Sequence, residues 1–151
     1  MKLKGFVAAV ALLAFAACSS GEKQPGPDSL YARMGGLNGI ARATDEMVNR
    51  VLTDPEILAN VELQKRAKPE NVPGIKVQIT NLLAGLAGGP ETYHGRSMKD
   101  SHRGMQVTEK QWYAFIKDCR AGMEAAKIGG KEIEEMVVIL ERMKPEIVEV
   151  K

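Results

Sequence analysis

The chain has 151 residues, of which 44% are hydrophobic and 5% aromatic, and its 21 basic and 19 acidic residues leave a formal net charge of +2. This length suits one folded domain with a single apolar core. The near-neutral charge argues against nucleic acid as a partner, because binding a phosphate backbone relies on clustered positive charge. With two cysteines and two histidines, the chain offers few side chains for a metal centre built by the protein alone.

The first seventeen residues have the pattern of a secretion signal. Lys2 and Lys4 give a basic start, and residues 5–17 are apolar or small up to Cys18. This run is shorter than the roughly 20 residues needed to span a membrane, and it resembles the signal and lipobox of bacterial lipoproteins. The resemblance implies that residues 1–17 are removed and that Cys18 becomes an acylated N-terminus, which anchors the chain to a membrane through its lipid. The alternative is an ordinary cleaved signal followed by a free cysteine.

The residues after Cys18 predict a tether and a location. Residues 18–28 are rich in glycine, proline and polar side chains, which is typical of a flexible linker. Serines rather than an aspartate follow Cys18, so the resemblance implies anchoring in the outer membrane, on its periplasmic side, or else on the outer face of the inner membrane. Without residues 1–17 the basic residues fall to 19, equal to the 19 acidic ones. One folded domain is expected over residues 29–151.

Helical periodicity begins with a stripe of apolar residues that runs from Ile40 to Leu52 and ends near Thr53. Asp54 is suited to cap a short helix that has Pro55 at its first position. Residues 65–73 are charged and contain two prolines, so they are expected to form a loop.

The next helix is predicted where apolar side chains recur from Ile75 to Leu86, and it stops at Gly88-Gly89-Pro90. Thr108, followed three residues later by Gln111, predicts a capping box at the start of another helix.

Two further apolar stripes complete the chain. The first runs from Trp112 to Met123 and includes Cys119, which is expected to be a buried small hydrophobe. The second follows Gly129-Gly130 and continues to Ile147, with Pro145 expected to kink its final turn. No segment shows the alternation typical of a strand, so the sequence predicts an all-α fold. Periodicity alone leaves open which helical bundle it forms.

Two groups of residues resemble group I truncated haemoglobins. The first group is Leu30-Tyr31-x-x-Met34-Gly35-Gly36-x-x-x-Ile40, then Asp45-Glu46 and Arg50-Val51-Leu52-x-Asp54-Pro55. The second is Gly88-Gly89-Pro90-x-x-Tyr93-x-Gly95-Arg96-x-Met98-Lys99-x-x-His102. Each motif is modest alone, but together they occur in the family's order between residues 30 and 148. The resemblance implies a truncated globin-like sandwich of two helices over two.

The resemblance also implies haem b between the helices, with His102 as the proximal ligand of the iron. One imidazole is enough because the porphyrin supplies four nitrogens. His94 is expected to be a loop residue rather than a second ligand, and no residue is assigned a catalytic role. The side chains expected to line the pocket are, on the distal side, Val48, Val61, Ile75, Gln78, Ile79 and Leu82 and, on the proximal side, Met98, Val107, Trp112 and Phe115.

The distal side departs from the family's pattern. Truncated haemoglobins generally place tyrosine or histidine, phenylalanine, and glutamine or a similar polar residue where this chain has Val48, Val61 and Ile75. O₂ at haem carries partial negative charge, so a pocket without donors is expected to hold it less well. We therefore hypothesise a preference for NO or CO over O₂, unless Gln78 turns inward.

The function implied is binding of a diatomic gas (O₂, NO or CO) outside the cytoplasm. Turnover, as in an NO dioxygenase or a peroxidase-like enzyme, would depend on a reductase that the sequence does not identify. Gly35-Gly36 does not belong to a dinucleotide-binding G-x-G-x-x-G motif. The alternative function is a lipoprotein that keeps the globin scaffold, has lost haem and acts as an interaction module, which the missing distal residues favour.

Overall fold

The computed structural model describes residues 25–91 and 93–150. The expected signal, the acylated Cys18 and the tether up to residue 24 lie outside the described residues. Among the residues described, no helix is long and apolar enough to cross a membrane. The helices are α1 (Leu30–Arg33), α2 (Gly36–Val51), α3 (Pro55–Leu58), α4 (Val61–Arg66), α5 (Val72–Leu86), α6 (Met98–His102), α7 (Glu109–Ala125), α8 (Gly130–Glu141) and α9 (Lys144–Ile147).

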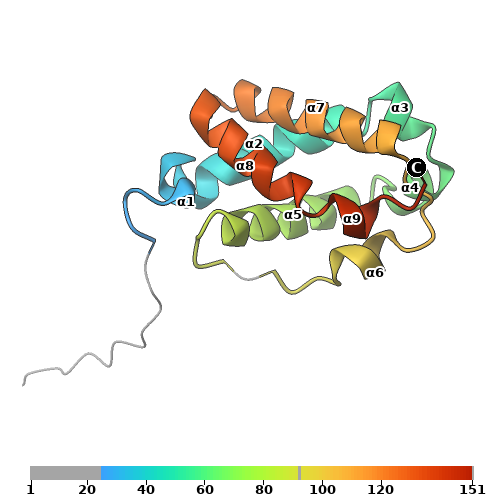
Figure 1. Cartoon of the computed structure of the whole chain (residues 1–151), viewed down its shortest axis with the longest axis horizontal. Helices are drawn as coiled ribbons and strands as arrows, with labels where there is room; N and C mark the ends of the chain where they lie inside the picture. The colour runs from blue at the N-terminus through green and yellow to red at the C-terminus, as the bar shows by residue number, and fades with distance from the viewer. Residues whose placement is uncertain (1–24, 92, 151) are drawn as a thin grey trace, which may run out of the picture.

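Four long helices make up the body of the fold (Figure 1). α2 packs most extensively against α7, and it also contacts α5, while α7 contacts α8. The pairs α2–α5 and α7–α8 form the two-over-two arrangement that the resemblance implied. A single core lies between them, and its buried side chains include Ile40, Met47, Leu83, Trp112 and Met136. The all-α prediction is confirmed.

The predicted helix starts are present. The Asp54 side chain accepts a hydrogen bond from the backbone N–H of Glu56 at 2.8 Å and so caps α3. Thr108 and Gln111 form the reciprocal capping box of α7. Local capping chemistry therefore determines where these two helices begin.

The loop predicted over residues 65–73 is shorter than expected. α4 extends to Arg66, and its first turn is stabilised by Asn60, whose side chain accepts a hydrogen bond from the N–H of Leu63 at 2.9 Å. α5 begins at Val72 with Pro73 in its first turn, where the fixed φ of proline suits a helix and no N–H is needed. Residues 67–71 alone connect the two helices.

The last apolar stripe forms two helices rather than one kinked helix. α8 ends at Glu141 and α9 begins at Lys144. Pro145 has no N–H to donate to the carbonyl of Glu141 four residues earlier, and its ring crowds that carbonyl. Ile147 is nevertheless buried, with 8% of its surface exposed, so α9 packs onto the core as a separate element.

α2 and α7 approach each other closely at Gly122. A Cβ atom on Gly122 would lie 2.6 Å from the backbone N of Met47 and 2.8 Å from its Cα. These are backbone atoms of the opposite helix, so the two helices would have to separate to make room for it.

Gly122→Ala is therefore expected to lower the free energy of unfolding by about 1–3 kcal/mol, the usual cost of overpacking. Gly130→Ala is the matched control, because a Cβ there meets nothing within 4 Å, and it should be neutral or stabilising by up to about 1 kcal/mol. Urea unfolding followed by the fluorescence of Trp112, the chain's single tryptophan, measures both. Equal stabilities of the two variants would contradict the close approach.

Candidate functional site

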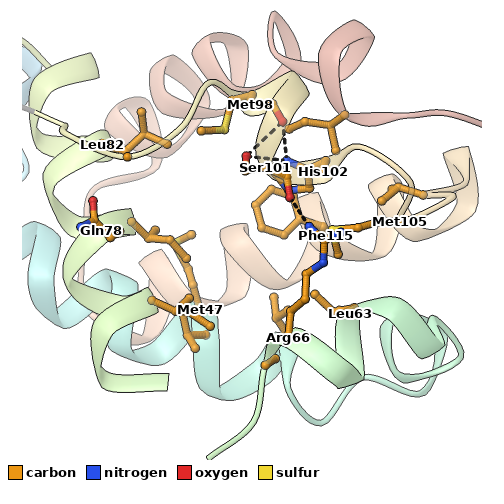
Figure 2. Close-up of a pocket in the computed structure, with 18 of the residues that line it drawn as sticks. Met47, Leu63, Arg66, Gln78, Leu82, Met98, Ser101, His102, Met105 and Phe115 are labelled. Carbon is orange, nitrogen blue, oxygen red and sulfur yellow. Dashed lines mark hydrogen bonds between the residues drawn. The ribbon is translucent and has the colours of Figure 1, made fainter. Parts of the chain in front are cut away.

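A cavity of about 760 Å³ lies among α2, α5, α6 and α7. Its walls are mostly apolar, and His102 of α6 and Arg66 of α4 bring polar groups to them (Figure 2). The volume falls within the range of about 300–1,000 Å³ that is usual for cofactor and small-molecule sites.

The structure gathers most of the residues singled out in the sequence around this cavity. They come from helices that are distant in the chain, so the fold alone brings them together. The side chains that line the cavity with His102 are Val48, Ile75, Gln78, Ile79, Leu82, Met98, Val107, Trp112 and Phe115.

Val61 does not reach the cavity, in contrast to the expectation. It is the first residue of α4 and is 60% exposed. The residue before it, Asn60, is buried because its side-chain amide donates to the carbonyl of Met105 at 2.9 Å and to Oε1 of Gln111 at 3.1 Å. With Asn60 turned inward, Val61 faces outward, and Leu63 lines the cavity instead.

His102 is held in one orientation by a hydrogen bond of its own helix. Its Nδ1 lies 2.8 Å from the carbonyl oxygen of Met98 and 3.2 Å from Oγ of Ser101 (Figure 2). A carbonyl oxygen only accepts, so the neutral ring carries its proton on Nδ1. Nε2 then keeps its lone pair, and no described residue forms a hydrogen bond with it. This is the tautomer in which Nε2 can bind a metal ion.

The surroundings of His102 favour the neutral ring. Burial lowers its pKa below the ordinary value of 6.5, and the positive charge of Arg66 acts in the same direction. The hydrogen bond to Met98 and the negative charge of Glu149 oppose these effects without cancelling them. A neutral imidazole is the form that coordinates metals.

Arg66 was not predicted to take part in the site. Its guanidinium reaches from α4 to the C-terminal end of α6 and donates to the carbonyl of Ser101 at 2.6 Å (Figure 2). It also donates to the carbonyl of Arg103 at 3.2 Å. These carbonyls flank His102 on either side. The sequence signal for this role is weak, because Arg66 is one of several charged residues in a short segment and its acceptors are backbone atoms.

The wall formed by α2 and α5 offers few hydrogen-bond donors. Val48, Ile75 and Ile79 contribute only apolar side chains to it. Gln78 is the polar side chain that the described part of α5 places on the lining; it is exposed and forms no hydrogen bond with a described residue.

Polar residues at one edge of the cavity come from the loop between α5 and α6. Tyr93, His94 and Arg96 all line the cavity, and His94 and Arg96 are exposed. The Tyr93 hydroxyl donates to the carbonyl of Arg96 at 2.8 Å and so stabilises the turn.

Among the described residues, His102 has no companions for a metal site built by the protein alone. Within residues 25–91 and 93–150, no group of three or more His, Cys, Asp or Glu side chains is placed to hold a metal ion. Cys119 is fully buried in α7, and burial raises the pKa of its thiol far above the ordinary value, so the thiol is unreactive. The arrangement therefore suits a metal whose other ligands come from a bound group rather than from the protein.

The family model described as bacterial-like globin matches residues 29–149. Among curated proteins, the chain is 24% identical over 124 residues to a group 1 truncated haemoglobin of Tetrahymena pyriformis, covering 80% of this chain and 95% of that one. It is 26% identical over 115 residues to a group 1 truncated haemoglobin of Nostoc sp., covering 76% of this chain and 90% of that protein.

Solved structures agree with this fold. The Fe(III) form of the Tetrahymena pyriformis truncated haemoglobin superposes with a TM-score of 0.71 at 23% identity, covering 80% of this chain and 97% of that one. The group II truncated haemoglobin of Bacillus anthracis gives a TM-score of 0.69 at 20% identity, covering 85% and 95%.

Proposed function

The chain belongs to the bacterial-like globin family and has the fold of a truncated haemoglobin, and from this premise we propose that it binds haem b beside His102. In this proposal Nε2 of His102 is the axial ligand of the iron. The observation that carries it is an imidazole whose Nδ1 is bonded to the carbonyl of Met98, on a residue that lines a large apolar cavity, so that Nε2 is left for a ligand.

The residues of the cavity fit haem. Its volume of about 760 Å³ suits a large planar group. Apolar side chains from α5 and α7, such as Leu82 and Phe115, would pack on either side of the porphyrin and exclude water. The single histidine matches a metal that arrives with four nitrogen ligands.

Arg96 is the side chain best placed to meet the haem propionates. It lies at the exposed edge of the cavity. Arg103, which is also near His102, instead pairs with Asp100. A carboxylate at the edge of the cavity would gain a charge-assisted hydrogen bond from the Arg96 guanidinium.

His102→Ala is expected to abolish the Soret band that appears when hemin is added to the purified protein, because the variant has no imidazole at the axial position. His94→Ala is the control, since it removes the other histidine of the chain. His94 also lines the cavity, and the His94→Ala variant should keep the Soret band. A band that survives in His102→Ala and disappears in His94→Ala would reverse the assignment. A protein that retains no hemin after gel filtration would favour a scaffold that has lost haem.

Haem, when bound, supplies an iron that takes a diatomic gas such as O₂, NO or CO. The protein's part is to present a wall in which Val48, Ile75 and Ile79 offer no side-chain donor, while Gln78 is the polar side chain of α5 on the lining. A donor stabilises O₂, which carries partial negative charge, more than it stabilises CO. We therefore propose that the pocket favours NO or CO and releases O₂ quickly.

Ile75→Gln is expected to slow O₂ dissociation by roughly three- to tenfold, the effect of one added hydrogen bond. Val77→Gln is the matched control: it adds the same carboxamide to α5, but at a position that is 57% exposed and outside the cavity lining. Stopped-flow measurement of O₂ release and of autoxidation compares the two. Slow O₂ release and a long-lived oxygenated form of the unmodified protein would refute the apolar-pocket proposal.

We also propose that lipid on Cys18 anchors the globin domain to a membrane outside the cytoplasm. The support is the resemblance of residues 1–18 to a lipoprotein signal and lipobox. Residues 19–28 would then form the tether to α1.

In a bacterial host fed labelled palmitate, the full chain should incorporate label and sediment with membranes, and Cys18→Ala should do neither. Cys119→Ala removes the other cysteine, which is fully buried, and should still be labelled. A labelled Cys18→Ala protein would contradict the anchor.

A further inference from the structure

The C-terminal strap, defined here as residues 143–150, lies against the segment that carries His102. Its helix α9 contacts α6 (Figure 1). After α9 the strap continues in extended form beside the loop that precedes α7. There the N–H groups of Glu149 and Val150 both donate to the carbonyl of Val107, at 2.9 and 3.1 Å. The strap therefore supports both α6 and the chain that follows it.

Glu149 binds the loop before α7 through both of its carboxylate oxygens. Oε1 accepts from the N–H of Gly104 at 2.8 Å, and Oε2 accepts from the N–H of Gln106 at 2.6 Å. These two hydrogen bonds are the main cause of a lowered pKa for the Glu149 carboxyl, which is therefore ionised at neutral pH. Two amides converging on one anion form a clamp that a neutral side chain cannot reproduce, because a carboxamide has only one acceptor oxygen.

The loop conformation depends on such a partner. Gly104 and Gln106 have φ values of 74° and 54°. This left-handed region is unfavourable for a residue with a side chain, such as Gln106, and persists when surrounding contacts enforce it. The anion of Glu149 is the contact that joins these two residues.

The clamp acts next to His102. The N–H of Met105 donates to the carbonyl of His102 at 2.9 Å, so the loop that Glu149 binds is hydrogen-bonded directly to the backbone of the histidine. α6 has five residues, none of them fully buried, and it packs through the partly buried Met98 and against α9. Arg66 holds the same segment from α4 through the carbonyls of Ser101 and Arg103.

We infer that Glu149 is a positioning residue for His102: by fixing residues 104–106, it maintains the orientation in which the ring bonds Met98 through Nδ1 and keeps Nε2 free. The inference rests on the proposed function where it concerns iron, since a fixed Nε2 matters as a ligand. The orientation of the ring itself can be tested without haem.

The test compares Glu149→Gln with Glu146→Gln in the full chain. Glu146 is an exposed glutamate of the same strap whose side chain forms no hydrogen bond or ion pair with a described residue. Without hemin, Glu149→Gln should speed amide exchange at Gly104 and Gln106 by about tenfold or more, the effect of losing a charged hydrogen bond. The ring ¹⁵N signals of His102 should change from one tautomer to a mixture. Glu146→Gln should leave both measurements unchanged.

With hemin added, Glu149→Gln should lose hemin to an apomyoglobin acceptor about tenfold faster than the unmodified protein. In the ferrous state its iron–histidine stretching band should shift or broaden in the resonance Raman spectrum. Unchanged ring signals together with an unchanged rate of hemin loss would overturn the inference. If the unmodified protein takes up no hemin while the ring signals still respond to Glu149→Gln, the proposed function fails and the positioning role stands.

Circular dichroism and thermal melting check that each variant remains folded. Should Glu149→Gln unfold, Glu149→Asp replaces it, because it keeps the charge but shortens the reach by one methylene. The expected direction of each change is the same.

Discussion

The hydrogen bond from Nδ1 of His102 to the carbonyl of Met98 fixes the orientation of the ring at the cavity. It fixes the tautomer, and the tautomer decides whether a lone pair or a proton is on Nε2. The apolar lining supports the same state, since burial lowers the pKa of the ring. The unprotonated state of Nε2 therefore depends on one hydrogen bond within α6 and on the apolar walls contributed by α2, α5 and α7.

This hydrogen bond persists only while the short helix α6 keeps its conformation. An isolated helix of five residues is unstable in water because nucleation is costly, and no α6 side chain is fully buried, although Met98 and His102 are partly buried. Side chains from other parts of the fold hold the C-terminal end of α6 and the loop that follows it. Arg66 holds the carbonyls of Ser101 and Arg103, Asn60 holds that of Met105, and Glu149 holds the amides that follow. α4 with its N-cap residue Asn60, together with the C-terminal strap, therefore holds the end of α6 and the loop after it.

The sequence predicted the parts of the fold that depend on side-chain type and spacing. Apolar stripes gave the four long helices, and the glycine pairs and His102 pointed to the globin pattern. The two misses at the site share one cause, which is pairing between a side chain and a distant backbone group. Asn60 turns inward to bond the carbonyl of Met105, and this moves Val61 out of the cavity. Arg66 likewise finds backbone acceptors 35 and 37 residues away. The spacing of residue types along the chain does not predict such pairs of a side chain and a distant backbone carbonyl.

The two sides of the cavity are stabilised by different means, which lets them vary independently. The ring of His102 is held by polar contacts within α6, to the carbonyl of Met98 and the hydroxyl of Ser101. The opposite wall, with Val48 and Ile75, takes no part in those contacts. Under the proposed function, a change of donor on that wall would alter the affinity for a gas without disturbing His102. Apolar residues at the positions where the family has polar distal ones are therefore compatible with the described contacts of His102.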